Sequence, residues 1–329
     1  MRSRNPAAPL FDFLSYGRRG PERRDHLSPT QIAQIARTAQ RTPEVMVKVL
    51  PAGTGTLGGV RRHLDYIGRH GDVDLETDDG QELRGRDVAA GLLEDWDLDL
   101  EEHRRQSGLS AGHGRPPPRL VYKVVFSMPA GTAREKVHSA VRNFCREQFT
   151  LQHRHVLALH TDEPHPHVHA VIKAVSEQGR RLNLKKATLR EWRAEFARHL
   201  RAVGVAANAT PRFVRGETTP RKSDGIYRAG QRGESTHLRQ RVEAAAAALL
   251  KRDGRAEPAK LELLQGRQEV ERKWRAVADI LLSQGQRELA AQTRRYADAL
   301  PPPQTEREWL MARLLERTRE PRRQEQSTR

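Results

Sequence analysis

The sequence predicts an α+β fold in which helices pack on an antiparallel sheet, followed by a mainly α-helical C-terminal region. Short β-branched runs of strand length occur between stretches with helical periodicity. Past about residue 220 the composition changes to Ala, Leu, Arg, Glu and Gln. We therefore expect three parts: a basic, loosely ordered arm over 1–43, an α+β domain over 44–220, and a helical region over 221–329.

Four segments are typical of strands because they are short, rich in Val and Leu, and bounded by turn residues. They are VMVKVL at 45–50, VYKVVFSM at 121–128, VLALH at 156–160 and HVHAVIKAV at 167–175. The last two are separated only by TDEPHP, which predicts a hairpin and hence antiparallel pairing.

The helices are predicted from apolar stripes and start signals. The first spans 56–69, and capping boxes at Thr132–Glu135 and Thr188–Glu191 open two more. Residues 72–117 are acidic and then Pro-rich, which indicates a long connection with one short helix around 89–96. The C-terminal region has helical stretches near 236–252, 258–298 and 305–318.

The charge of the chain points to a polyanionic partner. Its 59 Lys and Arg against 42 Asp and Glu give +17, and nucleic acid is the first candidate. No apolar run approaches the length of a membrane-spanning helix, and the start MRSRNPAAPLFDFL lacks the apolar centre of a signal peptide, so we expect a cytoplasmic protein without membrane insertion. Cys145 is the only cysteine, which excludes a disulfide framework and a thiolate metal cluster.

Four histidines fall within ten residues, in HTDEPHPHVH. Strand alternation places His167 and His169 on one face, and a hairpin would bring His160 beside them, so that three imidazoles converge on one cation. Asp162 is placed to orient a ligand histidine, while the prolines on either side of His165 leave its direction open. The alternatives are a surface turn without metal, or a structural zinc site closed by a fourth ligand.

The expected cofactor is a divalent metal. We expect Mg²⁺ or Mn²⁺ first, with Zn²⁺, Ni²⁺ and Co²⁺ as alternatives, although neutral imidazoles accept Mg²⁺ less readily than the others.

The helix at 56–69 carries a tyrosine on its polar side. Leu57, Val60, Leu64 and Ile67 form its apolar stripe, and Tyr66 falls opposite, between Arg62 and Arg69. A phenol between two guanidiniums is suited to holding a phosphodiester. The alternative is a solvent-facing tyrosine between solubilising arginines. Tyr16, which also has arginines beside it, is the second candidate.

These residues, in this order, resemble the relaxases and mobilisation proteins of the two-histidine (HUH) endonuclease superfamily, most closely the crown-gall T-DNA border endonucleases. The resemblance covers about residues 45–215 in three blocks: KVLPAGTGTLGGVRRHLDYIGRHG, YKVVFSMPAGT and HTDEPHPHVHAVIKA. It implies Tyr66 as the nucleophile, Ser127 as a DNA contact, Asp162 as a supporting carboxylate, and metal ligation by His160, His167 and His169. As in relaxases, and unlike replication initiators, the tyrosine precedes the histidines. The N-terminal arm and the C-terminal region depart from the family.

The resemblance implies a relaxase that nicks one strand at an origin of transfer through a 5′-phosphotyrosyl intermediate and can rejoin it. Single-stranded DNA, relaxosome accessory proteins and a type IV coupling protein are the expected partners. Export with the transferred strand is also implied, and the basic tail REPRRQEQSTR is similar to type IV export signals. The alternatives are a metal-dependent hydrolytic nuclease or phosphatase, and a non-catalytic DNA-binding accessory protein.

Overall fold

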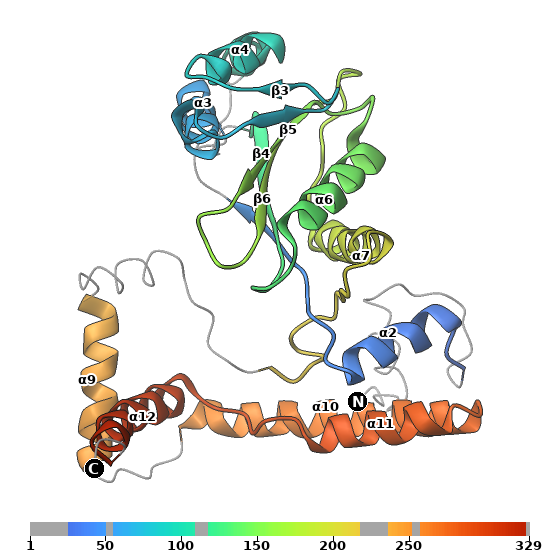
Figure 1. The fold of residues 1–329 in the computed structure, drawn as a ribbon, viewed down its shortest axis with the longest axis vertical. Helices are drawn as coiled ribbons and strands as arrows, with labels where there is room; N and C mark the ends of the chain where they lie inside the picture. The colour runs from blue at the N-terminus through green and yellow to red at the C-terminus, as the bar shows by residue number, and fades with distance from the viewer. Residues whose placement is uncertain (1–25, 51–54, 109–117, 218–235, 252–256, 327–329) are drawn as a thin grey trace. The chain divides into compact units, whose positions relative to one another are not determined.

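A computed structural model of the chain (Figure 1) describes residues 26–50, 55–108, 118–217, 236–251 and 257–326. The chain divides into two compact units, one over Arg41–Ala209 and the other formed by Met1–Gln40 with Thr210–Arg329. The sequence predicted a domain over 44–220 instead. The N-terminal limits nearly coincide, whereas the described residues 210–217 group with the helical unit.

Six antiparallel strands form the sheet of the first unit, in the order β1-β4-β6-β5-β2-β3. The four longer strands are the predicted ones: β1 (Met46–Leu50), β4 (Val121–Ser127), β5 (His155–His160) and β6 (His167–Lys173). The short strands β2 (Leu75–Thr77) and β3 (Glu82–Leu83) extend the β5 edge and lie in the connection expected to have only modest structure. The predicted antiparallel α+β fold is confirmed, and the sheet is wider than expected.

Helices cover both faces of this sheet (Figure 1). One face packs against α6 (Arg134–Phe149) and α7 (Lys186–Ala202) through a core that includes Phe126, Phe144 and Phe196. The other packs against α3 (Leu57–Ile67), α4 (Val88–Asp95) and α5 (Leu98–Gly108). A 3-10 turn, η1 (Arg69–Gly71), follows α3. The face of β5 and β6 that carries His160, His167 and His169 is the one that α3 covers.

Both predicted capping boxes are wrong. α6 begins after Ala133, and the Thr132 hydroxyl instead donates to the Pro129 carbonyl at 2.8 Å. α7 begins at Lys186, so Thr188 lies within the helix, and no side chain caps its start. The apolar faces predicted for these helices are correct because burial against the sheet, rather than the local start signal, determines them.

The second unit is helical, as predicted for the C-terminal region. It contains α2 (Pro29–Ala39), α9 (Thr236–Leu250), α10 (Pro258–Ser283), α11 (Arg287–Asp298) and α12 (Glu306–Gln326). Its core is built around Trp274 and Tyr296, and Ile35 from α2 belongs to it. Residues 29–39 of the expected loose arm are therefore a helix packed on the C-terminal helices. Among the described helices, none is both long enough and apolar enough to cross a bilayer.

Candidate active site

Helix α3 presents Tyr66 on its exposed side. The Thr56 side chain caps the helix by accepting a hydrogen bond from the Gly59 amide. Val60, Leu64 and Ile67 are at most 1% exposed. Tyr66 is 43% exposed, on the opposite side from this stripe, as the periodicity predicted. The phenol is therefore accessible to a ligand although its helix is anchored in the core.

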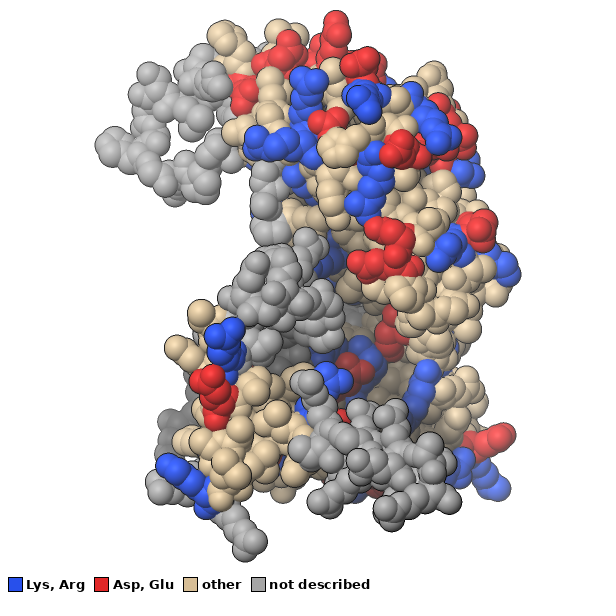
Figure 2. Space-filling view, turned by 60° about the vertical axis from the view of Figure 1, so that its left-hand side comes forward, with Lys and Arg blue, Asp and Glu red and all other residues tan. Residues whose placement is uncertain are grey.

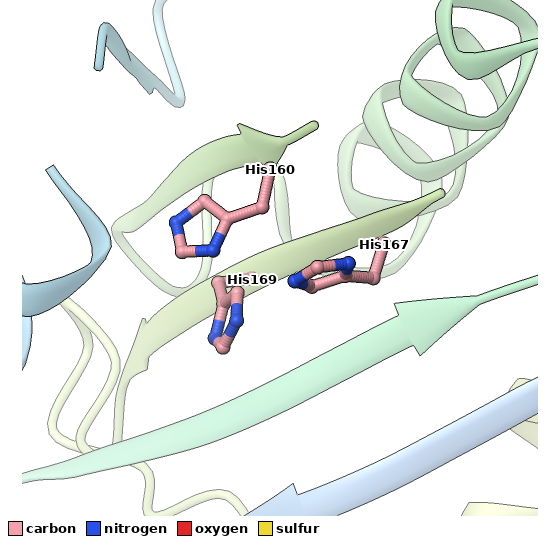
Figure 3. A group of neighbouring side chains, drawn as sticks. All are labelled: His160, His167 and His169. Atoms are coloured by element: carbon pink, nitrogen blue, oxygen red, sulfur yellow. The ribbon is translucent and has the colours of Figure 1, made fainter. Parts of the chain in front are cut away.

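The β5–β6 hairpin brings the three predicted histidines together. Its register pairs His160 with His167 and Ala158 with His169, so all three imidazoles lie on one face. One ring nitrogen from each lies within 4.8 Å of the other two. Figure 3 shows the rings from β5 and β6 turned toward one another. The convergence predicted from strand alternation is present.

Hydrogen bonds hold two of these rings and leave one nitrogen of each for another partner. His160 Nε2 bonds to the Ile67 carbonyl at 2.8 Å, and His167 Nδ1 bonds to the His165 carbonyl at 3.2 Å. Because a carbonyl only accepts, the bonded nitrogen carries the proton and the other ring nitrogen keeps a lone pair. His169 Nδ1 is buried and has no hydrogen-bond partner within the described residues.

The three-histidine cluster is electrostatically suited to a cation. Burial, together with the neighbouring His160 and His167 rings, lowers the pKa of His169 to about 3, and burial likewise lowers the pKa of His160. Neutral imidazoles are the form in which histidine coordinates metal. Converging lone pairs and one unpartnered buried nitrogen fit a divalent metal of the kind that nitrogen ligands bind.

Tyr66 lies beside this cluster. Its ring centroid is 6.1 Å from that of His169 and 6.2 Å from that of His160. The predicted nucleophile and the predicted metal ligands, which are far apart in the sequence, therefore share one site. Tyr16 lies outside the described residues.

Arg69 reaches into the same site. Its guanidinium carbon is 5.0 Å from the centroid of the Tyr66 ring, and its Nη2 is 3.4 Å from His160 Nδ1. Arg69 also forms an ion pair with Asp162. Asp162 was expected to orient a ligand histidine, but the second nitrogen of His160 bonds to the Ile67 carbonyl and Asp162 holds the guanidinium instead.

The other predicted site residues lie around the cluster. Arg62 is exposed on α3. Ser127 is buried at the end of β4, directly across the ladder from His167. His165 pairs with Glu163, at 2.7 Å from Nε2 to the carboxylate, and its ring centroid is 5.7 Å from that of His167. Glu163, His165 and His167 form a second group whose potential ligand atoms lie within 4.8 Å of one another.

Two residues near the site were not predicted. His63 lies one turn before Tyr66, with its ring 6.1 Å from the Tyr66 ring and 6.0 Å from His169. Burial, with the charges of Lys123 and His160, lowers the pKa of His63 to about 3. Burial and the charge of Arg62 lower the pKa of Lys123, on β4, to about 8. The i, i+3 spacing of His63 and Tyr66 was a signal available in the sequence.

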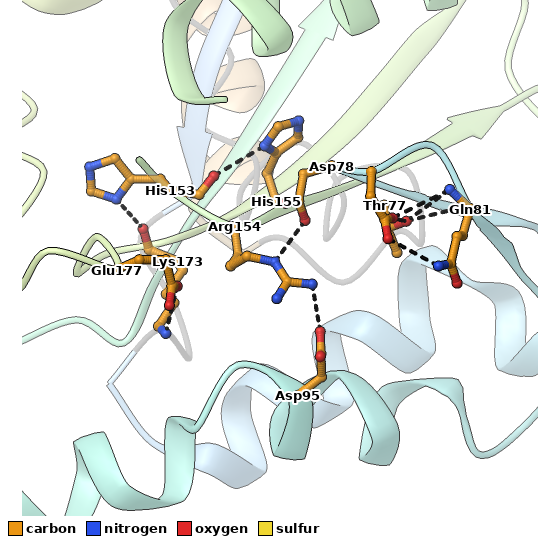
Figure 4. Close-up of polar contacts among 10 residues, drawn as sticks. Thr77, Asp78, Gln81, Asp95, His153, Arg154, His155, Lys173 and Glu177 are labelled. Atoms are coloured by element: carbon orange, nitrogen blue, oxygen red, sulfur yellow. Dashed lines mark hydrogen bonds and ion pairs between the residues drawn. The ribbon is translucent and has the colours of Figure 1, made fainter. Parts of the chain in front are cut away.

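The opposite end of β5 carries a second polar group (Figure 4). Arg154 bridges Asp78 and Asp95, at 3.0 and 2.7 Å. His153 Nδ1 bonds to the Lys173 carbonyl at 2.9 Å and His155 Nδ1 to the His153 carbonyl at 3.2 Å. These contacts join β5 to neighbouring strands and loops, so we assign this polar group a structural role.

On the side drawn in Figure 2, surface charge by itself does not single out a DNA-binding face. Lys and Arg are interspersed there with Asp and Glu. Several charged side chains pair locally; Arg198, for example, contacts Glu147 and Glu195 at 2.6 Å. The site geometry is therefore a stronger guide to function than the net charge.

Comparison with known proteins agrees with this geometry. The family model for the MobA/VirD2-like relaxase nuclease domain matches residues 73–204, which contain all three histidines and begin after Tyr66. The T-DNA border endonuclease VirD2 of Agrobacterium fabrum is 26% identical over 215 residues, covering 60% of this chain and 46% of the relative. The VirD2 proteins of Rhizobium radiobacter and Rhizobium rhizogenes are also 26% identical, over 200 and 139 residues.

These two alignments cover 53% and 39% of this chain, and 43% and 30% of the relatives. The chain thus spans less than half the length of the relatives it matches. Taken with the α+β fold and the three-histidine cluster, these matches support a relaxase of the VirD2 type: residues 73–204 are similar to the nuclease domain of MobA/VirD2-like relaxases.

Proposed function

We propose that this chain nicks one strand of DNA at an origin of transfer by tyrosine transesterification and can rejoin it. The observation that carries the proposal is the juxtaposition of the exposed Tyr66 with the buried imidazoles of His160 and His169, at ring distances of 6.2 and 6.1 Å. A phosphate at this point would contact a nucleophile and a cation site together, which is the arrangement that in-line displacement needs.

His160, His167 and His169 would hold a divalent metal. The hydrogen bonds to the Ile67 and His165 carbonyls fix two of the rings, and the buried Nδ1 of His169 lacks a partner among the described residues. When bound, the metal would act as a Lewis acid on a non-bridging phosphate oxygen. Mg²⁺ and Mn²⁺ are the first candidates, with Zn²⁺, Ni²⁺ and Co²⁺ as alternatives.

Four further side chains around the three-histidine cluster would position the Tyr66 phenol and the DNA. The Arg69 guanidinium lies over the Tyr66 ring, where it would attract a phosphate. Arg62 lies on α3 one turn before Tyr66, where it would contact a neighbouring phosphate. Ser127 borders the three-histidine cluster opposite His167. Asp162 holds Arg69 in place.

The reaction exchanges one phosphodiester for another. A bond forms between the Tyr66 oxygen and the phosphorus while the bond from phosphorus to the 3′ oxygen breaks. The phenolic proton leaves to solvent and the departing 3′ oxygen acquires one, giving a free 3′-hydroxyl and a 5′-phosphotyrosyl link. Attack by a 3′-hydroxyl on that link reverses the reaction without an external energy source.

Denaturing gels distinguish this proposal from its alternatives. The chain is mixed with Mn²⁺ and single-stranded oligonucleotides tiled across the DNA that flanks its gene, then treated with sodium dodecyl sulfate. A relaxase leaves protein on a 5′ end, a hydrolytic nuclease leaves a free cut end, and an accessory protein leaves intact DNA.

The decisive variant is Tyr66→Phe. We expect it to bind DNA as the wild type does and to form at least about 10³-fold less adduct, because the nucleophile is lost. Tyr122→Phe is the matched control, since the Tyr122 hydroxyl bonds to the Leu182 carbonyl at 2.9 Å, away from the histidines. Nicking by Tyr66→Phe at the wild-type rate would overturn the proposal.

A relaxase of this type would work in the bacterial cytoplasm with relaxosome accessory proteins, and a type IV coupling protein would deliver it together with the transferred strand. The helical unit that holds α9 to α12 is the part of the chain available for such partners. The basic tail proposed as an export signal extends beyond the described residues, which end at 326.

A further inference from the structure

The turn after α3 places Arg69 in a fixed position. Arg69, His70 and Gly71 have φ angles of 48°, 56° and 100°, so three successive residues adopt left-handed backbone. A Cβ at Gly71 would lie 2.6 Å from the carbonyl carbon of Gly85, so only glycine fits there. Because this turn is tightly packed, the direction in which the Arg69 side chain leaves the backbone is set.

The Arg69 guanidinium connects three residues of the proposed site. It pairs with Asp162, lies 5.0 Å from the Tyr66 ring centroid, and places Nη2 at 3.4 Å from His160 Nδ1. Asp162 keeps 53% of its side chain exposed, so the ion pair lies at the solvent edge of the three-histidine cluster.

The nitrogen of His160 that faces Arg69 is the one a metal would use. His160 Nε2 donates to the Ile67 carbonyl at 2.8 Å, which leaves the lone pair on Nδ1. Arg69 Nη2 is a donor directed at this same atom. One lone pair cannot bind an N–H donor and a metal ion at the same time, so the two partners exclude each other.

We propose that Arg69 competes with the metal for His160 Nδ1 and thereby sets the metal affinity of the site. Asp162 is a positioning residue that acts through Arg69: when a metal takes His160, the carboxylate holds the released guanidinium beside Tyr66. Metal binding and the presentation of Arg69 to a phosphate are then one coupled rearrangement. This inference rests on the metal site proposed above, and it concerns how that site is filled.

Isothermal titration of the full chain with Mn²⁺, in the absence of DNA, tests the competition. Arg69→Gln removes the competing cation and retains a polar side chain, so we expect its affinity for Mn²⁺ to rise on the order of ten-fold. Arg61→Gln removes the same charge from the exposed surface of α3 and should stay within about two-fold of the wild type. An Arg69→Gln chain that binds Mn²⁺ no better than the wild type would overturn the inference.

A double-mutant cycle tests the role of Asp162. In the wild-type background, Asp162→Asn should weaken Mn²⁺ binding several-fold, because the Arg69 guanidinium then has no carboxylate partner while it lies beside the metal ion. In the Arg69→Gln background the same change should have an effect within about two-fold, because the field of a half-exposed carboxylate is screened by water. An equal loss in both backgrounds would mean that Asp162 supports a histidine directly.

Failure of the metal site itself gives a different result. A wild-type chain that binds no Mn²⁺ would overturn both the site and this competition. Equal affinities for wild type and Arg69→Gln would overturn the competition alone and leave the three-histidine site intact.

Discussion

Strand β5 has a histidine at each end, and the two ends have different surroundings. At one end His160 meets His167 and His169, with ring centroids 5.2 and 4.5 Å away. At the other end, the rings of His155 and its neighbour His153 pack edge-on against Phe149, at 5.9 and 6.4 Å. The two groups point to opposite faces of the sheet, because His155 and His160 are an odd number of residues apart.

Burial does not distinguish these two groups. Desolvation lowers the pKa of His153 and His155, as it does for His160 and His169, so all four imidazoles are neutral at physiological pH. The difference is where the lone pairs point. A buried, neutral histidine is common in a protein core, and several whose nitrogens converge on one point indicate a ligand site.

The largest effect should come from removing a converging histidine. His167→Ala takes one of the three nitrogens from the cluster, so Mn²⁺ affinity should fall at least about 100-fold, since loss of an outer partner alone costs 10- to 100-fold. Isothermal titration measures this loss, and thermal unfolding of the metal-free chain serves as the control for folding. Retention of wild-type affinity would show that convergence of these rings does not mark a metal site.

The matching change at the other end is His155→Ala. His155 is 2% exposed and packs on Phe149, so its removal leaves a cavity and should lower the free energy of unfolding by about 2 kcal/mol. Affinity for Mn²⁺ should be unchanged once the variant is folded. Chemical denaturation gives the first quantity and titration the second, and a loss of metal binding would contradict a structural role.

A histidine outside both groups, His138, sharpens the comparison because it contacts a charged pair. His138 and Arg142 on α6 contact Glu76, at 3.2 and 2.7 Å. Burial opposes ionisation of Glu76, but hydrogen bonds from His138 and Arg142 outweigh it and lower its pKa to about 2 from 4.5. This depressed pKa stabilises the fold above about pH 4.5, and the contribution disappears as the pH falls toward 2.

Glu76→Gln should therefore reduce the free energy of unfolding by about 2 kcal/mol at pH 7, and the difference from wild type should shrink as the pH falls from about 4.5 to about 2. Urea unfolding at a series of pH values measures this. A pH-independent difference would indicate that Glu76 contributes through packing rather than charge.

The smallest effect concerns a charge outside the three-histidine cluster. Arg62→Ala should reduce the slope of log affinity for single-stranded DNA against log salt by about 0.7, the value expected for one lost phosphate contact. Arg198→Ala, on α7 and paired with Glu147, is the control and should leave the slope unchanged. Fluorescence anisotropy across a salt series measures both. An unchanged slope for Arg62→Ala would place this residue away from the DNA.

The sequence predicted the structure best where a periodic pattern of apolar residues reflects burial in the core. The four longer strands and the stripe of Val60, Leu64 and Ile67 were predictable because every second or every third to fourth side chain has to enter the core. The convergence of the histidines followed from the same alternation and a short hairpin link. Strands β2 and β3 were missed because they have only three and two residues, too few for a pattern.

Contacts between distant side chains could not be predicted. Asp162 was assigned to a histidine from its spacing, but Arg69, which approaches from another element, takes its carboxylate. His63 was overlooked because its burial depends on strands that the helix meets only in the fold. The capping box at Thr132 failed because the helix begins one residue later than predicted, with Ala133 as its N-cap, and Thr132 lies in the preceding turn, where its hydroxyl donates to the Pro129 carbonyl.

The direct pairing of His160 with His167 has a consequence for how this domain is assembled. A slip of one residue between β5 and β6 would turn one strand's imidazoles to the other side of the sheet. A complete ligand set can therefore form only when the hairpin has its native alignment. A metal ion bound by all three rings would stabilise the native alignment of the hairpin, because it binds only the folded chain. Metal binding would therefore favour correct folding as well as catalysis.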